Sequence, residues 1–382
     1  MKSLSIKGII KKILALFPLK NIIIFESNPD FTDNTYWMFK YMVENQQIQN
    51  RYKLVWFVKK PENKVSELCG VKITCVDYFS NSVIEKIKKA HYNSRAKFII
   101  DCNVFVHKYS EKQVRVYLSH GMPLKAVDKF LSENYDVDLL TLTSSYFKPY
   151  FSKFINFENM QVLGSPRNDA LVINIKKPKL LEGYKTIIWM PTYRQHKASH
   201  DYSVENIFPL GIPVFKTVDE LKVLNDKLIS FNTILLLRPH PVQDLSVLNI
   251  GEYSNIIIAN DRFLEDNGVQ LYELLSVTDA LITDYSSIYY DYLLLNRPIA
   301  LTLEDIESFS SKWPLIFSNP EKEFIGEKIC TKTEFFDFIK NVSEEKDLLK
   351  EKRKISKNLF NEANDLNSSE RIYNYIKNRW NI

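Results

Sequence analysis

The sequence predicts an α/β fold with parallel sheets, arranged as two domains with flanking helices. Short apolar runs alternate with segments at helical spacing along most of the 382 residues, a pattern typical of parallel sheets. The alternation breaks once, in a segment rich in Lys, Pro and Gly at residues 175–184, and then restarts. We therefore expect one domain over residues 21–174 and a second over residues 175–360, with helices at residues 1–20 and 361–382.

The expected strands are short apolar runs bounded by polar segments. In the first domain they span Asn21–Glu26, Tyr52–Val58, Val71–Val76, Ala96–Asp101, Arg115–Leu118, Leu139–Thr143 and Gln161–Leu163. In the second domain they span Thr186–Met190, Thr233–Leu237, Asn255–Ala259 and Ala280–Thr283. Helical spacing is clearest at Thr35–Asn45, Ser80–Lys89 and Ile288–Leu295, and the tail from Glu344 onward is charged and helical.

The composition argues against several classes of protein. A net charge of +5, from 51 basic and 46 acidic residues, is too mild to indicate a nucleic-acid partner. Neither GxGxxG nor GxxxxGK[ST] occurs, so dinucleotide-binding and P-loop interpretations lose their main support. The four Cys are scattered, without a CxxC pair or a His at metal-ligand spacing. We expect reduced, unreactive thiols and no metal site encoded by the sequence.

Residues 1–20 contain five Lys and no acidic residue, interleaved with apolar side chains. Gly8 and the Lys11-Lys12 pair break the apolar runs, so no stretch approaches the ~20 residues that a membrane span requires. No small-residue cleavage site follows, which argues against a secretory signal. A basic amphipathic helix in the lipid headgroup layer is the expectation. The alternative is a helix packed on the protein's own surface.

The segment Asp279–Ile299 reads as a strand, a Ser-rich turn and a helix. Ser286 and Ser287 fall where the helix begins, so their hydroxyls and the free backbone N–H groups can hold an anion. An ordinary helix cap without a ligand is the alternative. The polar motifs PTYR and RPHP follow two other strands of the second domain. Because ligands collect beyond the carboxyl ends of parallel strands, we expect these three tips to converge.

Five motifs occur in a specific order: HGMPLK, GSPRND, MPTYR, RPHP and TDYSSIYYDYLLLNRPI. Together they resemble the CDP-glycerol glycerophosphotransferase family, which includes teichoic-acid primases and polymerases with relatives in capsule synthesis. The likeness runs from Phe25 to Arg371. It implies a GT-B fold, with two Rossmann-like domains facing a cleft and a C-terminal helix crossing back. It also implies peripheral attachment to the cytoplasmic face of the cell membrane.

The resemblance implies a reaction. A hydroxyl of a lipid-linked saccharide or growing polymer attacks a CDP-alditol, CDP-glycerol or CDP-ribitol, and CMP leaves. Glycerol phosphate is the expected group, in teichoic-acid or capsule synthesis. After Pro298 the chain lacks the RGxxxDY core common in the polymerases, so the alditol and acceptor stay open. The alternatives are a GT-B glycosyltransferase that uses a nucleotide sugar and a non-catalytic scaffold at the membrane surface.

Three residues are candidate catalytic groups. His120 follows a strand beside Gly121, and because an imidazole titrates near neutral pH we expect it to be the base. His240 lies between two Pro residues that fix the backbone, and is expected to donate to the pyrophosphate or protonate the leaving phosphate. Asp33 lies with Asp30 and Asn34 in the loop where the acceptor should enter. It is a candidate second base or acceptor contact, with a structural turn as the alternative.

The residues expected to contact the CDP-alditol are polar groups of the matching motifs. They are Thr192, Arg194, Arg238, Asp284, Ser286, Ser287, Asp291, Ser369 and Arg371. For each, a cap, a turn or a surface ion pair is the alternative. Lys125 is a possible phosphate contact, and Arg167, Asn168 and Asp169 are placed near the hinge between the domains. No cofactor is required by the sequence, the need for a divalent metal is open, and no DxD follows a strand.

Overall fold

The computed structural model describes residues 13–103, 106–126, 136–192, 208–239, 248, 253–317 and 323–382. It divides into two compact units. The first comprises the described residues within Met1–Met122, Val127–Ala170 and Glu362–Ile382, and the second those within Pro123–Ala126 and Leu171–Asn361. The sequence-based division put the boundary after residue 174 and left residues 123–126 in the first domain.

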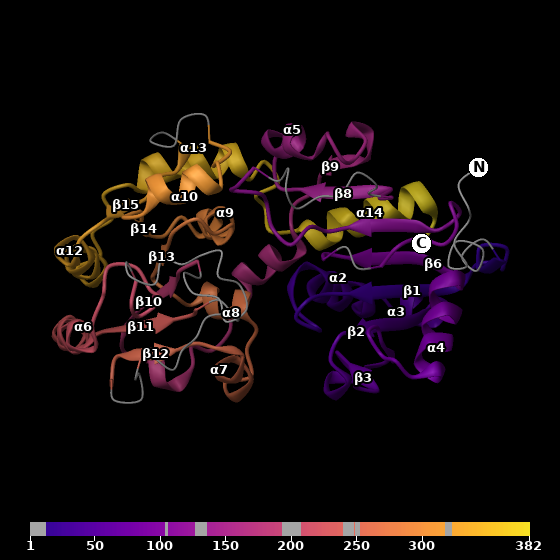
Figure 1. Cartoon of the computed structure of the whole chain (residues 1–382), viewed down its shortest axis with the longest axis horizontal. Coiled ribbons are helices and arrows are strands. Elements are labelled where there is room, and N and C mark those ends of the chain that lie inside the picture. Colours follow the sequence, from indigo (N-terminus) through magenta and orange to yellow (C-terminus); the bar gives the residue numbers. More distant parts are fainter. Residues whose placement is uncertain are drawn as a thin grey trace. The chain divides into compact units, whose positions relative to one another are not determined.

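In the first unit, the described residues form a parallel seven-stranded sheet in the order β5-β2-β1-β6-β7-β8-β9 (Figure 1). The strands are β1 (Lys20–Glu26), β2 (Lys53–Val58), β5 (Thr74–Asp77), β6 (Ala96–Asp101), β7 (Val114–Tyr117), β8 (Leu139–Leu142) and β9 (Met160–Val162). The chain order reverses between β1 and β6, which makes their carboxyl ends the switch point where ligands bind in open α/β sheets.

The helices of the first unit cover this sheet. They are α2 (Asp33–Glu44), α3 (Gln46–Arg51), α4 (Val83–Arg95), α5 (Lys148–Phe151) and α14 (Ser368–Trp380). Helix α14, yellow in Figure 1, packs on α2, and Ile372 and Ile376 are buried in the same apolar cluster as Met38 and Phe39. The chain therefore returns to the first unit at its C-terminal end.

In the second unit, the described residues form a parallel six-stranded sheet in the order β12-β11-β10-β13-β14-β15. The strands are β10 (Lys185–Met190), β11 (Thr233–Leu237), β12 (Ile256–Ile258), β13 (Ala280–Thr283), β14 (Ile299–Thr302) and β15 (Glu327–Ile329). The helices are α6 (Val218–Ser230), α7 (Asp261–Asp266), α8 (Leu271–Ser276), α9 (Ile288–Tyr292), α10 (Ile306–Lys312), α12 (Lys332–Ser343) and α13 (Lys350–Phe360). The switch point lies between β10 and β13.

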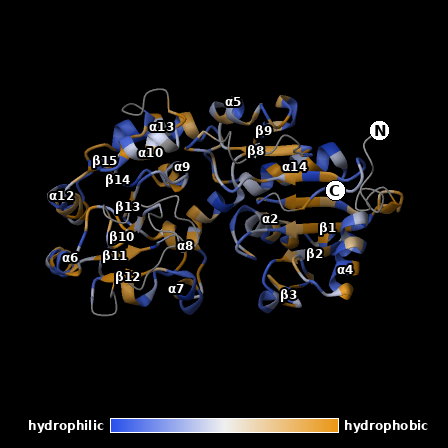
Figure 2. Ribbon diagram, in the orientation of Figure 1, coloured by the Kyte–Doolittle hydropathy of each residue, from blue (hydrophilic) through white to orange (hydrophobic). Residues whose placement is uncertain are grey.

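The strands form where the sequence carries continuous apolar runs, because both faces of a parallel sheet are buried. Figure 2 shows the strands of both sheets as mainly hydrophobic. The expected α/β class with two parallel sheets is confirmed. The expected strand Val71–Val76 is instead divided: β4 (Val71–Lys72) pairs with β3 (Glu67–Leu68) in a small hairpin, and β5 begins at Thr74. Positive φ angles at Cys69 and Gly70 make the tight turn of that hairpin.

Among the described residues, no helix has the length and apolar character needed to cross a membrane. Most of the helix expected at residues 1–20 lies outside the described residues, which begin at Ile13. Leu16 is 84% exposed, and the ring of Phe17 packs against the guanidinium of Arg95.

Candidate active site

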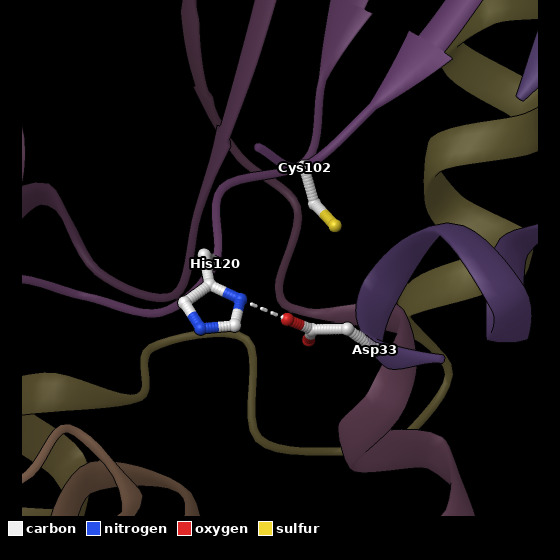
Figure 3. A group of neighbouring side chains, drawn as sticks. All are labelled: Asp33, Cys102 and His120. Carbon is white, nitrogen blue, oxygen red and sulfur yellow. Dashed lines mark ion pairs between the residues drawn. The ribbon is translucent and has the colours of Figure 1, made fainter. Parts of the chain in front are cut away.

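The first candidate group lies at the carboxyl ends of β1, β6 and β7. Asp33 opens α2 after the loop that follows β1, Cys102 follows β6, and His120 follows β7. Figure 3 shows the imidazole of His120 pointing its Nδ1 at the Asp33 carboxylate, with the Cys102 thiol beside the pair. His120 Nδ1 lies in contact with Asp33 Oδ2, and the His120 side chain is 61% exposed whereas that of Asp33 is 7% exposed.

Asp33 is held as a carboxylate by its two neighbours. Its Oδ1 accepts from Arg167 Nη1 at 2.7 Å, and its Oδ2 faces His120. Burial by itself raises the pKa of Asp33, but the charges and hydrogen bonds of Arg167 and His120 outweigh it and bring the pKa well below its ordinary value. The imidazole therefore faces a permanent negative charge on its Nδ1 side.

The turn that carries His120 is fixed by the buried side chain of Asn34. Its Nδ2 donates to the carbonyl oxygens of Leu118 at 3.2 Å and Ser119 at 2.8 Å. Ser119 has a φ of 60°, and its hydroxyl donates to the Gly121 carbonyl at 2.8 Å. Such a left-handed residue is uncommon outside Gly, so the surrounding contacts must hold it.

Among the described residues, one group of potential metal ligands comes together: Asp33, Cys102 and His120, with ligand atoms within 4.8 Å of one another. Burial, followed by the charges of Asp33 and Glu26, raises the pKa of the Cys102 thiol well above its usual value. The thiol is therefore neutral at physiological pH, and both Asp33 oxygens already face cationic or N–H groups. This arrangement suits an Asp–His pair better than a metal centre.

Asp30, the other acid of this loop, has a structural position. Its carboxylate accepts from the backbone N–H groups of Lys59 at 2.9 Å and Lys60 at 3.1 Å and from Asn63 Nδ2 at 2.9 Å. It braces the loop after β1 against the segment after β2, and the structure keeps it apart from the Asp33–His120 pair.

The second candidate group lies at the switch point of the second sheet. Thr192 follows β10, and both its backbone N–H and its hydroxyl donate to the buried carboxylate of Asp284, which follows β13. The N–H to Oδ1 distance is 2.9 Å. Ser286 and Ser287 are half-buried in the same turn, and Ser287 makes no capping hydrogen bond. The structure therefore brings Thr192, Asp284 and the Ser pair together.

Two other predicted donor contacts of this unit already have protein partners. Arg238, after β11, donates to the Ala259 carbonyl at 2.6 Å and to Asp261 Oδ1 at 2.7 Å. Asp291, in α9, accepts from the hydroxyl of Tyr272 at 2.6 Å and is buried. Their contact with a nucleotide stays a prediction. Arg194 and His240 lie outside the described residues.

The remaining predicted residues are placed as follows. The backbone N–H groups of Ser368 and Ser369 both donate to the Asp169 carboxylate at 2.7 Å, so Asp169 caps α14. Arg371 donates to the Leu163 carbonyl at 3.2 Å and pairs with Asp365. These contacts lie within the first unit, and the nucleotide roles of Ser369 and Arg371 remain predictions. Lys125 is in the second unit, with its ammonium 4.9 Å from the Phe309 ring centroid.

The contact of Arg167 with Asp33 is a feature of the candidate site that the sequence did not indicate. The motif GSPRND was singled out, but Arg167 was placed near the hinge without a partner. Asp33 and Arg167 are 134 positions apart. The two residues meet only because of the order of the strands in the sheet. The motif GSPRND was the one signal in the sequence that pointed to Arg167.

A family model described as CDP-glycerol:poly(glycerophosphate) glycerophosphotransferase matches residues 10–378. The chain belongs to this glycerophosphotransferase family. The family and the enzyme class indicated by the five motifs are thereby confirmed, and the protein is an enzyme of the CDP-glycerol glycerophosphotransferase type.

Two relatives of the family cover most of this chain. The chain is 25% identical over 400 residues to the teichoic acid glycerol-phosphate transferase of Staphylococcus aureus (strain NCTC 8325 / PS 47), covering 94% of each chain. It is 27% identical over 342 residues to a teichoic acid poly(glycerol phosphate) polymerase of Bacillus spizizenii, covering 80% of this chain and 79% of the relative.

Solved structures show the same fold. The wall teichoic acid polymerase TagF matches with a TM-score of 0.69 at 22% identity, over 94% of this chain and 89% of that chain. The UDP co-structure of MnaA from S. aureus matches with a TM-score of 0.55 at 15% identity, over 94% of this chain and 96% of that chain. These likenesses agree with the GT-B-like fold that the resemblance implied.

Proposed function

We propose that this family member transfers glycerol phosphate from CDP-glycerol to a hydroxyl of a lipid-linked saccharide or growing polymer in teichoic-acid or capsule synthesis, and releases CMP. Family membership and the names of relatives that cover most of the chain support this donor. Relatives named for ribitol phosphate match only 41% and 46% of the chain. CDP-glycerol is therefore the favoured donor, and CDP-ribitol is the competitor to be tested.

The observation that carries the mechanism is the pairing of His120 with the buried carboxylate of Asp33. An Nδ1–H that donates to this carboxylate leaves Nε2 unprotonated on the exposed side of the ring. Nε2 then takes the proton of the acceptor hydroxyl as its oxygen attacks the β-phosphorus of the donor. A phosphorus–oxygen bond forms to the acceptor, the bond to the bridging oxygen breaks, and CMP leaves.

The second unit is proposed to bind the donor. Phosphoryl transfer depends on positioning and charge neutralisation more than on covalent chemistry, and hydroxyls and guanidinium groups supply both. The proposed contacts in this unit follow β10, β11 and β13: Thr192, Arg194, Arg238, Asp284, Ser286 and Ser287, with Asp291 in α9. Ser369 and Arg371 of the first unit are proposed as further nucleotide contacts. His240 is proposed to protonate the leaving phosphate. This assignment requires no resident cofactor.

A lipid-linked acceptor requires the enzyme to work at a membrane surface, and α4 offers a suitable face. Val83, Ile84 and Ile87 are 70%, 66% and 63% exposed, and Figure 2 shows this hydrophobic first turn. Lys86 and Lys88 are exposed on the same helix. Exposed apolar residues beside cations favour insertion among anionic lipid headgroups. We propose that α4 and residues 1–20 attach the enzyme peripherally to the cytoplasmic face of the cell membrane.

The test is transfer measured by mass spectrometry with lipid-linked acceptor membranes and a donor panel of CDP-glycerol, CDP-ribitol and nucleotide sugars. Glycerol phosphate addition with equimolar CMP release is expected from CDP-glycerol. Replacement of a general base lowers the rate by about 10²–10⁴-fold, so the transfer rate of His120→Ala should fall by that factor. His107→Ala, at an exposed histidine outside the site, should keep its activity. Transfer only from nucleotide sugars, or a fully active His120→Ala, contradicts the proposal.

A further inference from the structure

Arg167 contacts both members of the Asp33–His120 pair. It lies in the 3₁₀ segment Pro166–Val172, and its side chain is 6% exposed. A single nitrogen, Nη1, donates to Asp33 Oδ1 at 2.7 Å and to the backbone carbonyl of His120 at 3.1 Å. The guanidinium therefore fixes the carboxylate and the turn that carries the imidazole at the same time.

The backbone of Arg167 belongs to the same framework. Its N–H donates to Asn34 Oδ1 at 3.0 Å, and the amide nitrogen of Asn34 holds the carbonyls of Leu118 and Ser119. Three segments far apart in the chain, the start of α2, the turn after β7 and the 3₁₀ segment, are thus joined by buried hydrogen bonds. A side chain held in this way loses little freedom when it orients a neighbour.

Arg167 is also the permanent cation in contact with Asp33. Among the described residues, the Cys102 thiol lies beside Asp33 and stays neutral, and Glu26, whose charge also acts on Cys102, is paired with Lys59. Without the guanidinium, the Asp33 carboxylate would keep the backbone N–H of Asn34, which donates to its Oδ1 at 2.8 Å, and the imidazole, but would lose the cation that compensates its charge. An uncompensated carboxylate favours the protonated imidazolium, and an imidazolium cannot accept the proton of a hydroxyl.

We propose that Arg167 is the positioning residue of the catalytic pair: it orients Asp33 and His120 and compensates the charge of the carboxylate that the imidazole faces. The inference rests on the proposed role of His120 as the base. Arg167 acts through Asp33 and the His120 turn, and no part of the proposal requires it to touch the substrate.

The test is a titration of His120 in the intact protein by NMR of ¹³Cε1-labelled histidine, with the His120 signal assigned from its loss in His120→Gln. In Arg167→Gln the midpoint should move up by about one pH unit, since a nearby charge shifts a titration by roughly this much. The acid limb of kcat for CDP-glycerol transfer should move with it, with KM for CDP-glycerol within about two-fold. In Arg167→Lys the charge remains, but the lysine side chain is shorter and lacks the planar guanidinium that places Nη1 between the two acceptors. The midpoint should therefore stay close to wild type while kcat falls about ten-fold.

Lys108→Gln is the matched control. Lys108 is a buried cation of the same unit, 3% exposed, that pairs with Asp136 and Asp138 at 3.0 Å ahead of β8. It lies near the amino end of a strand, away from the His120 turn, so its loss should reduce stability and leave the His120 midpoint unchanged.

An unmoved midpoint in Arg167→Gln overturns the proposal, and so do equal shifts in Arg167→Gln and Lys108→Gln. Should Arg167→Gln fail to fold, Arg167→Lys decides: a midpoint raised by a full unit although the charge is kept excludes the electrostatic role. The NMR titration midpoint of His120 is measured without any catalytic turnover. A fully active His120→Gln therefore refutes the base assignment separately from the effect of Arg167 on the imidazole.

Discussion

Glu26 shows how burial sets the charge of a single side chain next to the site. It ends β1, its side chain is 1% exposed, and it pairs with Lys59. Burial, with a smaller effect from Asp101, raises the pKa of Glu26 to about 7 despite the opposing effect of Lys59. Desolvation therefore exceeds the attraction of the nearby ammonium.

The raised pKa of Glu26 predicts a pH-dependent stability. Because the pKa of about 7 in the folded protein lies above the ordinary value of 4.5 for a Glu carboxyl, this carboxyl stabilises the fold fully below about pH 4.5, and that contribution is lost as pH rises through about 7. Glu26→Gln stays neutral at every pH. It should therefore remove this pH dependence of the free energy of unfolding, which amounts to up to about 3 kcal/mol between low and high pH.

Urea unfolding at pH 5 and pH 8 measures the effect of Glu26→Gln on the free energy of unfolding. The difference in the free energy of unfolding between Glu26→Gln and wild type should favour the variant more at pH 8 than at pH 5. Glu62→Gln, at an exposed carboxylate, is the control and should show no such difference. A Glu26→Gln effect of equal size at both pH values would contradict the assignment.

At the scale of elements, α14 docks on the first unit through a close approach at Gly164. A Cβ on Gly164 would lie 2.2 Å from Ser368 Oγ and 3.0 Å from Arg371 Nη2, and its φ is +89°. Asp169 caps the same helix from the segment that follows. Gly164 is therefore needed both for its conformation and for the space it leaves.

Gly164→Ala should destabilise the protein by about 2–4 kcal/mol, since overpacking and a left-handed Ala both cost energy. Gly70→Ala is the control: its φ is +74° but no atom lies within 4 Å of a built Cβ, so only about 1–2 kcal/mol is expected. Thermal unfolding measures the total loss of stability in each variant. Hydrogen exchange should show an additional loss of protection in α14 for Gly164→Ala. Equal effects of the two substitutions would exclude the close packing as the cause.

At the scale of the whole molecule, each unit is a doubly wound sheet with its candidate residues at the carboxyl ends of the strands around the switch point. The pattern is general for open α/β sheets. The exposed apolar residues of α4 allow the proposed membrane attachment of the whole enzyme to be tested.

Ile84→Asp combined with Ile87→Asp should weaken binding of the full-length enzyme to vesicles containing anionic lipid by about ten-fold or more, because it places acids among apolar contacts. Vesicle sedimentation measures this. Val223→Asp with Ile229→Asp is the control, since these residues of α6 are 49% and 52% exposed, and binding should be kept. Equal binding by all three proteins would show that another surface attaches the enzyme.

Local sequence predicted the fold well where burial is continuous. The expected strands Ala96–Asp101, Thr233–Leu237 and Ala280–Thr283 coincide with β6, β11 and β13. The sequence-based interpretation did not include β14 and β15, because runs of only four and three residues carry a weak local signal. It predicted the helix Ile288–Leu295, whereas α9 ends at Tyr292 and a 3₁₀ turn follows, closed by Asn296 at a φ of 49°.

The sequence by itself determined the class of fold, the family and the residue types available for phosphoryl transfer, because apolar runs and motif order are local properties of the chain. Only the tertiary structure decided which of those residues meet. Strand order brings Arg167 to Asp33 and His120, and the return of α14 brings Ser369 to Asp169. Such contacts depend on how distant segments pack and which charges become buried together, and no short-range pattern encodes them.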